Sequence, residues 1–83
     1  MNFRLAVEQA ALDFSLALRG PERTALMGFL NQLCAAPDTR GDLRFQDETL
    51  RWVERKVSGR LRATYWPDYA VRELRVVAIA RVH

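Results

Sequence analysis

Arginine dominates the chemistry that this sequence can offer. Twelve of its thirteen basic residues are arginine, and Lys56 is the single lysine. A guanidinium is planar and grips a phosphate or carboxylate through two hydrogen bonds, whereas an ammonium acts as a point charge. His83 is the one imidazole, a group that suits proton transfer near neutral pH. The sequence could therefore bind an anion and move a proton, although a terminal residue such as His83 can also be loosely held.

Several other kinds of site are excluded by residues that are missing. A single cysteine, Cys34, rules out an internal disulfide framework and a cysteine zinc site. The sequence has no glycine-rich phosphate loop, metal-ligand cluster or nucleophile elbow, so we expect no metal and no cofactor. No apolar run approaches the length of a membrane span, and the N-terminus does not resemble a signal peptide. We expect one cytoplasmic domain over residues 1–83, with no membrane partner.

The positive charge is concentrated in the C-terminal half. Residues 1–39 hold three basic and four acidic residues, a net charge of −1, whereas residues 40–83 hold ten basic and six acidic residues, a net charge of +4. This asymmetry indicates an anionic partner, either a nucleic acid or an acidic protein segment. The alternative is that the arginines reflect a GC-rich genome and are simply solvated.

Two helices are expected after a short N-terminal strand. Residues 3–7 alternate between apolar and polar, which predicts a half-buried strand. Apolar residues then recur at helical spacing over about 8–18, and Gly20 followed by Pro21 ends this helix and begins the next. The short link predicts a helical hairpin. The core stripe of the second helix comprises Ala25, Leu26, Phe29, Leu30, Leu33 and Cys34.

The C-terminal half is predicted to be β-structure. Residues 38–49 are polar and indicate an irregular connection with room for a short strand. A period of two then predicts strands over 50–57, 60–66 and 70–82. The predicted fold class is α+β with the order β-α-α-β-β-β. In this fold a helical hairpin packs on one face of a curved antiparallel sheet.

Alternation along the last two strands predicts which side chains share a face. A turn at Pro67-Asp68-Tyr69 should join these strands as neighbours, with their apolar sets toward the helices. Two helices can cover only one face of so small a sheet, so the other face is open. Parity places Ile79 on the open face and Ala80 on the covered face, and a β-bulge would reverse it. The other residues predicted to lie on the open face are Arg60, Arg62, Trp66, Arg75, Arg81 and His83.

A face that combines guanidinium groups with an indole suits a single-stranded nucleic acid. Arginines hold the phosphates, and an aromatic ring stacks on a base for about 1–3 kcal/mol. The residues expected to bind nucleic acid are Arg55, Lys56, Arg60, Trp66 and Arg75. The alternative is that Trp66 packs against its neighbours while the arginines pair with Glu54 and Glu73.

Several stretches of the chain carry a resemblance to a known family. These are the Leu-Arg-Gly-Pro-Glu-Arg link at 18–23, the leucine and alanine–proline helix end at 33–37, the glycine turn with an Arg-x-x-Tyr strand at 59–65, and the closing strand at 75–83. In this order they resemble the RelE/ParE toxin superfamily of bacterial toxin–antitoxin systems. The resemblance covers nearly the whole chain and implies a type II toxin with a cognate antitoxin protein as its partner.

The resemblance also implies site residues. Members of the RelE type cut mRNA in the ribosomal A site without a metal, and Arg62 matches their arginine that contacts the scissile phosphate. Arg81-Val82-His83 matches the Arg-x-His ending of the YoeB branch, in which the histidine takes part in proton transfer. The catalytic residues implied are thus Arg62, Arg81 and His83, and Asp42 stands near that branch's acidic general base.

Two departures keep other functions open. The chain ends at His83 without the terminal tyrosine of the RelE and YoeB branches, and the paired lysines of the RelE type are replaced around Glu54, Arg55 and Lys56. ParE-like members instead inhibit DNA gyrase and lack these residues. The first hypothesis is therefore a ribosome-dependent mRNA endonuclease with ribosome and mRNA as partners. The alternatives are a ParE-like gyrase inhibitor and a non-catalytic binding module.

Overall fold

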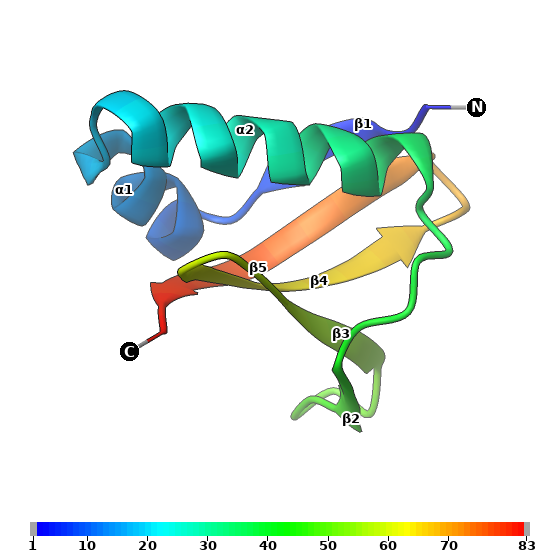
Figure 1. Ribbon diagram of the computed structural model, residues 1–83. Helices are drawn as coiled ribbons and strands as arrows, with labels where there is room; N and C mark the ends of the chain where they lie inside the picture. The colour runs from blue at the N-terminus through cyan, green and yellow to red at the C-terminus, as the bar shows by residue number, and fades with distance from the viewer. Residues whose placement is uncertain (1, 83) are drawn as a thin grey trace.

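Two helices cover one face of a five-stranded sheet in the computed structural model, which describes residues 2–82 (Figure 1). The elements are β1 (Arg4–Val7), α1 (Gln9–Ala17), α2 (Gly20–Ala35), β2 (Leu43–Gln46), β3 (Trp52–Ser58), β4 (Leu61–Asp68) and β5 (Glu73–Arg81). The strands lie in the order β1-β5-β4-β3-β2. The predicted α+β fold, with a helical hairpin on one face of a sheet, is confirmed.

The sheet is mixed and not wholly antiparallel as the sequence predicts, because one of its ladders is parallel. β1 pairs parallel with β5, and the other neighbouring strands pair antiparallel. The polar connection contains the short strand β2, which pairs with β3 at the sheet edge. β4 continues through Pro67 and Asp68, which the sequence predicts as a turn, and the turn itself lies at 69–72.

The link between the helices is built as its residues predict. Gly20 has φ +57°, a left-handed conformation that costs glycine little, and Pro21 follows in the first turn of α2. Glu22 also lies in this turn, where the helix dipole favours a negative charge. The link therefore turns α2 back across the sheet.

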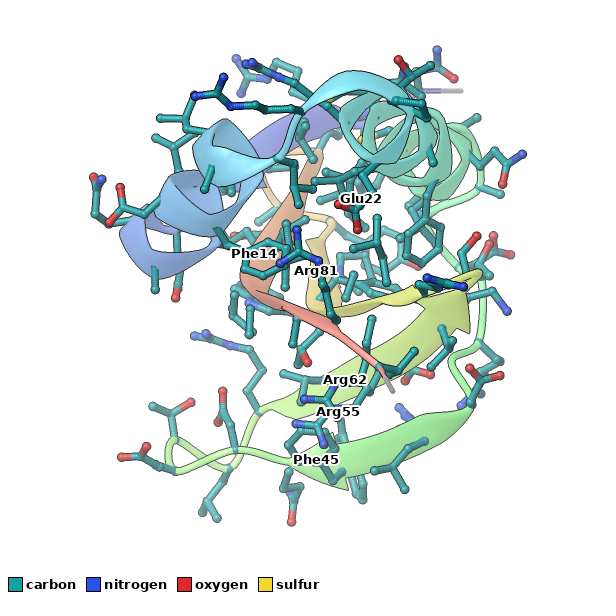
Figure 2. The ribbon with its side chains drawn as sticks, turned by 60° about the vertical axis from the view of Figure 1, so that its left-hand side comes forward. Phe14, Glu22, Phe45, Arg55, Arg62 and Arg81 are labelled. Atoms are coloured by element: carbon teal, nitrogen blue, oxygen red, sulfur yellow. The ribbon has the colours of Figure 1, made fainter. Side chains whose placement is uncertain are left out.

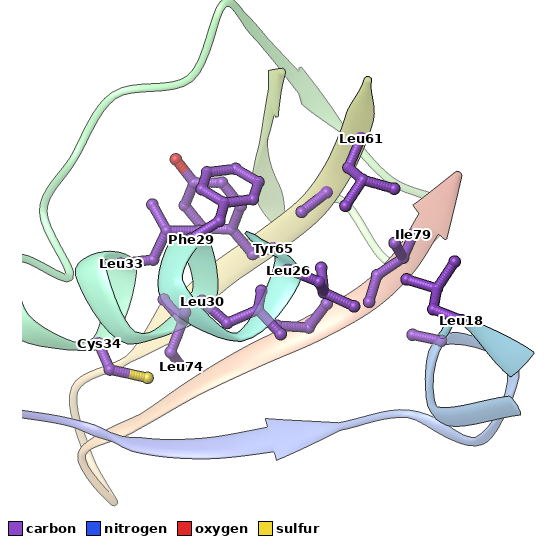
Figure 3. Packing of buried hydrophobic residues seen from close by; sticks show 13 residues of the cluster. Leu18, Leu26, Phe29, Leu30, Leu33, Cys34, Leu61, Tyr65, Leu74 and Ile79 are labelled. Atoms are coloured by element: carbon purple, nitrogen blue, oxygen red, sulfur yellow. The ribbon is translucent and has the colours of Figure 1, made fainter. Parts of the chain in front are cut away.

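The core lies between the helices and the sheet (Figure 3). From α2 it receives Leu26, Phe29, Leu30, Leu33 and Cys34, which confirms the predicted stripe apart from the exposed Ala25. From the sheet it receives Leu61, Ala63, Tyr65, Leu74, Val76 and Ile79. Burial raises the pKa of the Cys34 thiol, consistent with a packed apolar role.

A β-bulge interrupts the pairing of β4 with β5. Thr64 pairs with Ala78 and Tyr65 pairs with Val76, so Val77 is left between two consecutive partners of β4. One extra residue in a strand of period two exchanges the faces of every side chain beyond it. The parity count along β5 therefore holds only up to Val76.

Beyond the bulge the predicted faces of β5 are wrong. Ile79 pairs with Ala63 and is buried in the core, although parity places it on the open face. Ala80 pairs with Arg62 on the open face, although parity places it beneath the helices. Arg81 pairs with Leu61 and therefore lies on the covered face. The physical reason is the extra residue at the bulge.

Candidate nucleic-acid interface

The face of the sheet that the helices leave open carries a guanidinium group without a partner. Arg62 lies in β4 between Val57 of β3 and Ala80 of β5. Its side chain is partly buried, and among residues 2–82 no group forms a hydrogen bond or ion pair with its guanidinium. The charge of Arg62 is therefore available to an anion that docks on this face.

Arg55 stands beside Arg62 on the same face and is oriented by uncharged groups (Figure 2). Its Nε donates a hydrogen bond to Thr64 Oγ1 at 3.2 Å, and its guanidinium carbon lies 4.9 Å from the centre of the Phe45 ring. Neither contact neutralises the charge, since a hydroxyl and an aromatic ring carry no formal charge. Arg55 and Arg62 form what we call the arginine pair.

Trp66 extends the open face along β4. Arg51 and Arg75 both approach its ring, with guanidinium carbons 3.9 Å and 5.7 Å from the ring centre. Arg75 is also held by two carboxylates, with Nε 3.3 Å from Asp68 Oδ2 and Nη2 2.9 Å from Glu73 Oε1. The alternative of ion pairing therefore describes Arg75, which pairs across strands with Asp68 and within β5 with Glu73, whereas the arginine pair has no such partner.

Arg81 lies across the sheet from this interface. It contacts Glu22 of α2 through two hydrogen bonds, Nε to Oε2 at 3.0 Å and Nη2 to Oε1 at 2.9 Å, and it lies over the Phe14 ring of α1 (Figure 2). The hydrogen bond from Arg81 holds the pKa of Glu22 below its ordinary value. The prediction that Arg81 shares a helix-free face with Arg62 is wrong, because the bulge reverses the parity of β5.

Two further basic residues expected to bind nucleic acid also lie apart from the arginine pair. Arg60 occupies the turn between β3 and β4 and lines a groove with Glu22 and Arg81. Lys56 pairs with Ala63, so it points to the covered side of the sheet. Alternation alone separates Lys56 from Arg55, since neighbouring residues of a strand face opposite sides.

The sequence suggests two proton-transfer groups, His83 and Asp42. His83 lies outside the described residues. The Asp42 carboxylate accepts a hydrogen bond from the Val57 backbone N–H at 2.8 Å, which anchors the loop before β2 against β3. Gly41 is required beside it, because a Cβ there would lie 2.6 Å from the Arg55 carbonyl oxygen. Asp42 therefore has a structural contact of its own.

Sequence reasoning missed Phe45 and Arg51. A period of two over 51–55 places Arg51 on the same face as Arg55, and the antiparallel pairing of β2 with β3 adds Phe45 to it. Within residues 2–82 no group of three or more potential metal ligands is found. No helix in the described part of the chain is long and apolar enough to cross a membrane.

The open face can therefore hold a polyanion. Two guanidinium groups without carboxylate partners can grip phosphates, and a neighbouring indole offers a flat apolar ring. Of the acidic residues in the described strands, Asp68 and Glu73 lie on this face, and both contact Arg75, while Asp47 in the β2–β3 loop lies near Arg51. The face thus combines fixed positive charge with a stacking surface.

Searches with the sequence find no matching family model and no matching curated protein. The fold is shared with solved structures. A chain of the toxin-antitoxin complex RelBE2 from Mycobacterium tuberculosis matches 99% of this chain over 100% of its own length, with a TM-score of 0.80 and 14% identity. A chain of the archaeal RelE-RelB complex from Pyrococcus horikoshii matches 98% of this chain over 96% of its own, with a TM-score of 0.75 and 13% identity.

A third structure, the intact RelBE toxin-antitoxin complex of E. coli, contains a chain that matches 98% of this chain over 98% of its own. Its TM-score is 0.65 and its identity 15%. Coverage of almost the entire chain in all three cases shows that this protein has the RelE fold. At these identities the likeness carries the fold alone.

Proposed function

We propose that this protein is the toxin of a type II toxin–antitoxin system and that it cuts mRNA on the ribosome. The RelE fold supports the general role of a toxin. The observation that carries the activity is the arginine pair, because Arg55 and Arg62 offer charge without a carboxylate partner on the open face. An arginine with a structural role usually has its charge neutralised by an ion pair. Two neighbouring arginines of a sheet that lack such a partner therefore favour a ligand.

The chemistry follows from the charge that develops at phosphorus. The ribose 2′-oxygen loses its proton and bonds to phosphorus, and the 5′-oxygen leaves with a proton, so the reaction requires RNA. Negative charge accumulates on the phosphoryl oxygens in the transition state. The Arg62 guanidinium would stabilise it, in the role of a preorganised donor, and Arg55 would hold a neighbouring phosphate. By resemblance, His83 would transfer the protons.

Arg81 would have to give up its present contacts before it could take part in the same cleavage. Its guanidinium is committed to Glu22 on the covered side, so contact with RNA on the open face would require breaking both hydrogen bonds. This placement favours the second candidate function, a ParE-like inhibitor of DNA gyrase or a non-catalytic binding module. In either of these roles the open face would bind without cleaving.

The proposed partner of the toxin is an antitoxin, as in the three similar complexes. We expect an amphipathic segment that covers the sheet or the helical hairpin and complements the net charge of +3. Charge complementarity speeds encounter and makes it sensitive to salt. Binding to the product of the adjacent reading frame should weaken as ionic strength rises, and binding that does not change with salt would contradict this account.

A reconstituted translation system separates the candidates. The purified protein is added to a reporter mRNA with and without ribosomes, and cut ends are mapped by primer extension. Cuts that appear only with ribosomes support the proposal. Intact mRNA together with inhibited supercoiling by DNA gyrase would replace it with the gyrase inhibitor. Intact mRNA together with unaffected supercoiling would favour the non-catalytic binding module.

A further inference from the structure

The Arg51 side chain covers the indole ring of Trp66 through a weak contact. The Arg51 guanidinium carbon lies 3.9 Å from the ring centre, which is stacking distance. Among residues 2–82 this guanidinium has no ion pair and no hydrogen bond, although the nearby Asp47 carboxylate attracts it electrostatically. A cation–π contact on an exposed residue is weaker than the stacking of a nucleobase on an aromatic ring. A base could therefore take the place of Arg51.

The backbone beneath Arg51 is fixed, so the side chain alone has to move. Asp47 Oδ1 accepts hydrogen bonds from the Thr49 N–H at 2.9 Å and the Arg51 N–H at 3.1 Å. Leu50 between them has φ +63°, a left-handed conformation that is costly for leucine. The loop thus places Arg51 over the ring. Its side chain is attracted to Asp47 but not hydrogen-bonded to it, so it can swing away from the ring without breaking a hydrogen bond.

Trp66 also carries an unused hydrogen-bond donor. Its Nε1 is buried and has no acceptor among the described residues. Buried donors are nearly always satisfied, so an orphaned one calls for a physical reason. An acceptor that a ligand brings to the edge of the ring would supply it.

We propose that Trp66 is a stacking platform for one unpaired base of single-stranded RNA, with Arg51 as its displaceable cover. This inference rests on the proposed function and adds a binding site to it. Trp66 is four residues from Arg62 along β4, about 13 Å away. One strand of RNA could therefore place a phosphate on the arginine pair and a base on Trp66, while Arg51 turns to a phosphate.

The chemistry of the site favours RNA over an acidic peptide. Both would satisfy the positive charge of Arg51 and the arginine pair. Only a planar base would use the face of the indole. The Nε1–H points outward in the plane of the ring, so its acceptor would be a ribose or phosphate oxygen beside the stacked base. An acidic peptide is therefore tested as a competing occupant.

The intrinsic fluorescence of Trp66 reports on stacking directly. Trp52, the other tryptophan, is exposed on the opposite face beside Arg44. A Trp52→Phe protein therefore keeps the site and leaves Trp66 as the sole tryptophan. Hexa-adenylate should quench this fluorescence with saturation, whereas an abasic ribose-phosphate hexamer and hexaglutamate should not. Absence of quenching by hexa-adenylate would overturn the inference.

The contribution of the ring is measured by affinity. Hexa-adenylate should bind the otherwise unchanged protein roughly 5- to 150-fold more tightly than the abasic hexamer. Trp66→Leu should abolish this preference and leave abasic binding unchanged, while Trp66→Phe should retain most of it. Equal affinity of the unchanged protein for both hexamers, or equal binding of hexaglutamate, would overturn the inference even if Trp66→Leu fails to fold.

The role of the cover is tested by Arg51→Ala in the Trp52→Phe protein. Removal of the guanidinium should increase quenching of Trp66 by acrylamide, and unchanged quenching would show that Arg51 is not a cover. Failure of the inference is distinguishable from failure of the proposed function. If ribosome-dependent cuts are found but no base stacking, the proposed function stands and the stacking inference fails. If stacking is found but no cuts, Trp66 is part of an RNA-binding site on a protein that does not cleave.

Discussion

Arg62 and Arg81 are the same residue type on adjacent strands, yet they lie in opposite environments (Figure 2). Arg62 faces away from the helices with no partner among the described residues. Arg81 faces the helices and forms two hydrogen bonds with Glu22. The difference shows that the covered face holds Arg81 in a structural contact, whereas the open face leaves the charge of Arg62 available to a ligand.

The cause of this difference is one residue. Without the bulge at Val77, Arg81 would follow the parity of Arg75 and point toward the open face. With it, Ile79 and Arg81 return to the covered side, where Ile79 fills the core and Arg81 reaches α2. A bulge can thus re-aim a side chain while the sheet continues.

The largest expected effect tests the covered face. Leu30→Ala removes a side chain that is 1% exposed between α2 and the sheet, and it should lower the free energy of unfolding by about 2–5 kcal/mol. Urea unfolding followed by circular dichroism measures it. Met27→Ala, on the outer side of the same helix, is the matched control and should change stability by less than about 0.5 kcal/mol. Equal losses in the two variants would contradict the assigned core.

The next effect contrasts the two arginines directly. Arg62→Ala should slow ribosome-dependent cleavage by about 100- to 1000-fold, because it removes one charged donor to the transition state, and it should leave the melting temperature unchanged. Arg81→Ala should lower the melting temperature and retain cleavage in the folded protein. Primer extension and thermal unfolding of both variants give the comparison, and the reverse pattern would return Arg81 to the catalytic site.

A smaller effect is expected at Tyr65, which lies on the covered face. Its hydroxyl donates a hydrogen bond to the Thr39 carbonyl at 3.1 Å, and burial, with Glu54 and Asp42 nearby, raises its pKa to about 12. Tyr65→Phe should cost about 1 kcal/mol at neutral pH, and the exposed Tyr69→Phe should cost little.

The raised pKa of Tyr65 also gives stability a dependence on alkaline pH. The unfolded chain releases this proton near pH 10 and the folded protein only near 12, so unfolding is favoured as pH rises through that window. Tyr65→Phe should flatten this loss of stability. A slope identical in the two proteins would show that the phenol is not held in its neutral form.

The smallest effect concerns the contact between Glu22 and Arg81. Because the pKa of Glu22 is lowered in the folded protein, its contribution to stability is complete above the ordinary glutamate range and is lost as pH falls through the folded value. Glu22→Gln should remove that acid-dependent part of the stability profile. Glu48→Gln, in the exposed β2–β3 loop, should leave the profile unchanged.

Local features of the sequence determined most of the fold. Gly20-Pro21 defined the helix link, the apolar spacing of α2 defined its buried side, and the period of two identified β3, β4 and β5. The alternation within β4 also placed Arg62 opposite Tyr65, and no bulge disturbs that strand's own parity. These signals are local because helix caps and side-chain periodicity depend on neighbours in the chain.

Only the tertiary structure decided how the strands align and which side chains meet. The parallel pairing of β1 with β5, the bulge at Val77, the Arg81–Glu22 contact and the position of Arg51 over Trp66 all join residues from different strands or helices. Alternation of apolar and polar residues does not reveal a β-bulge, because the same kinds of residue continue on either side of the extra residue. The face to which a late strand residue points is therefore set by the register that the packed core selects.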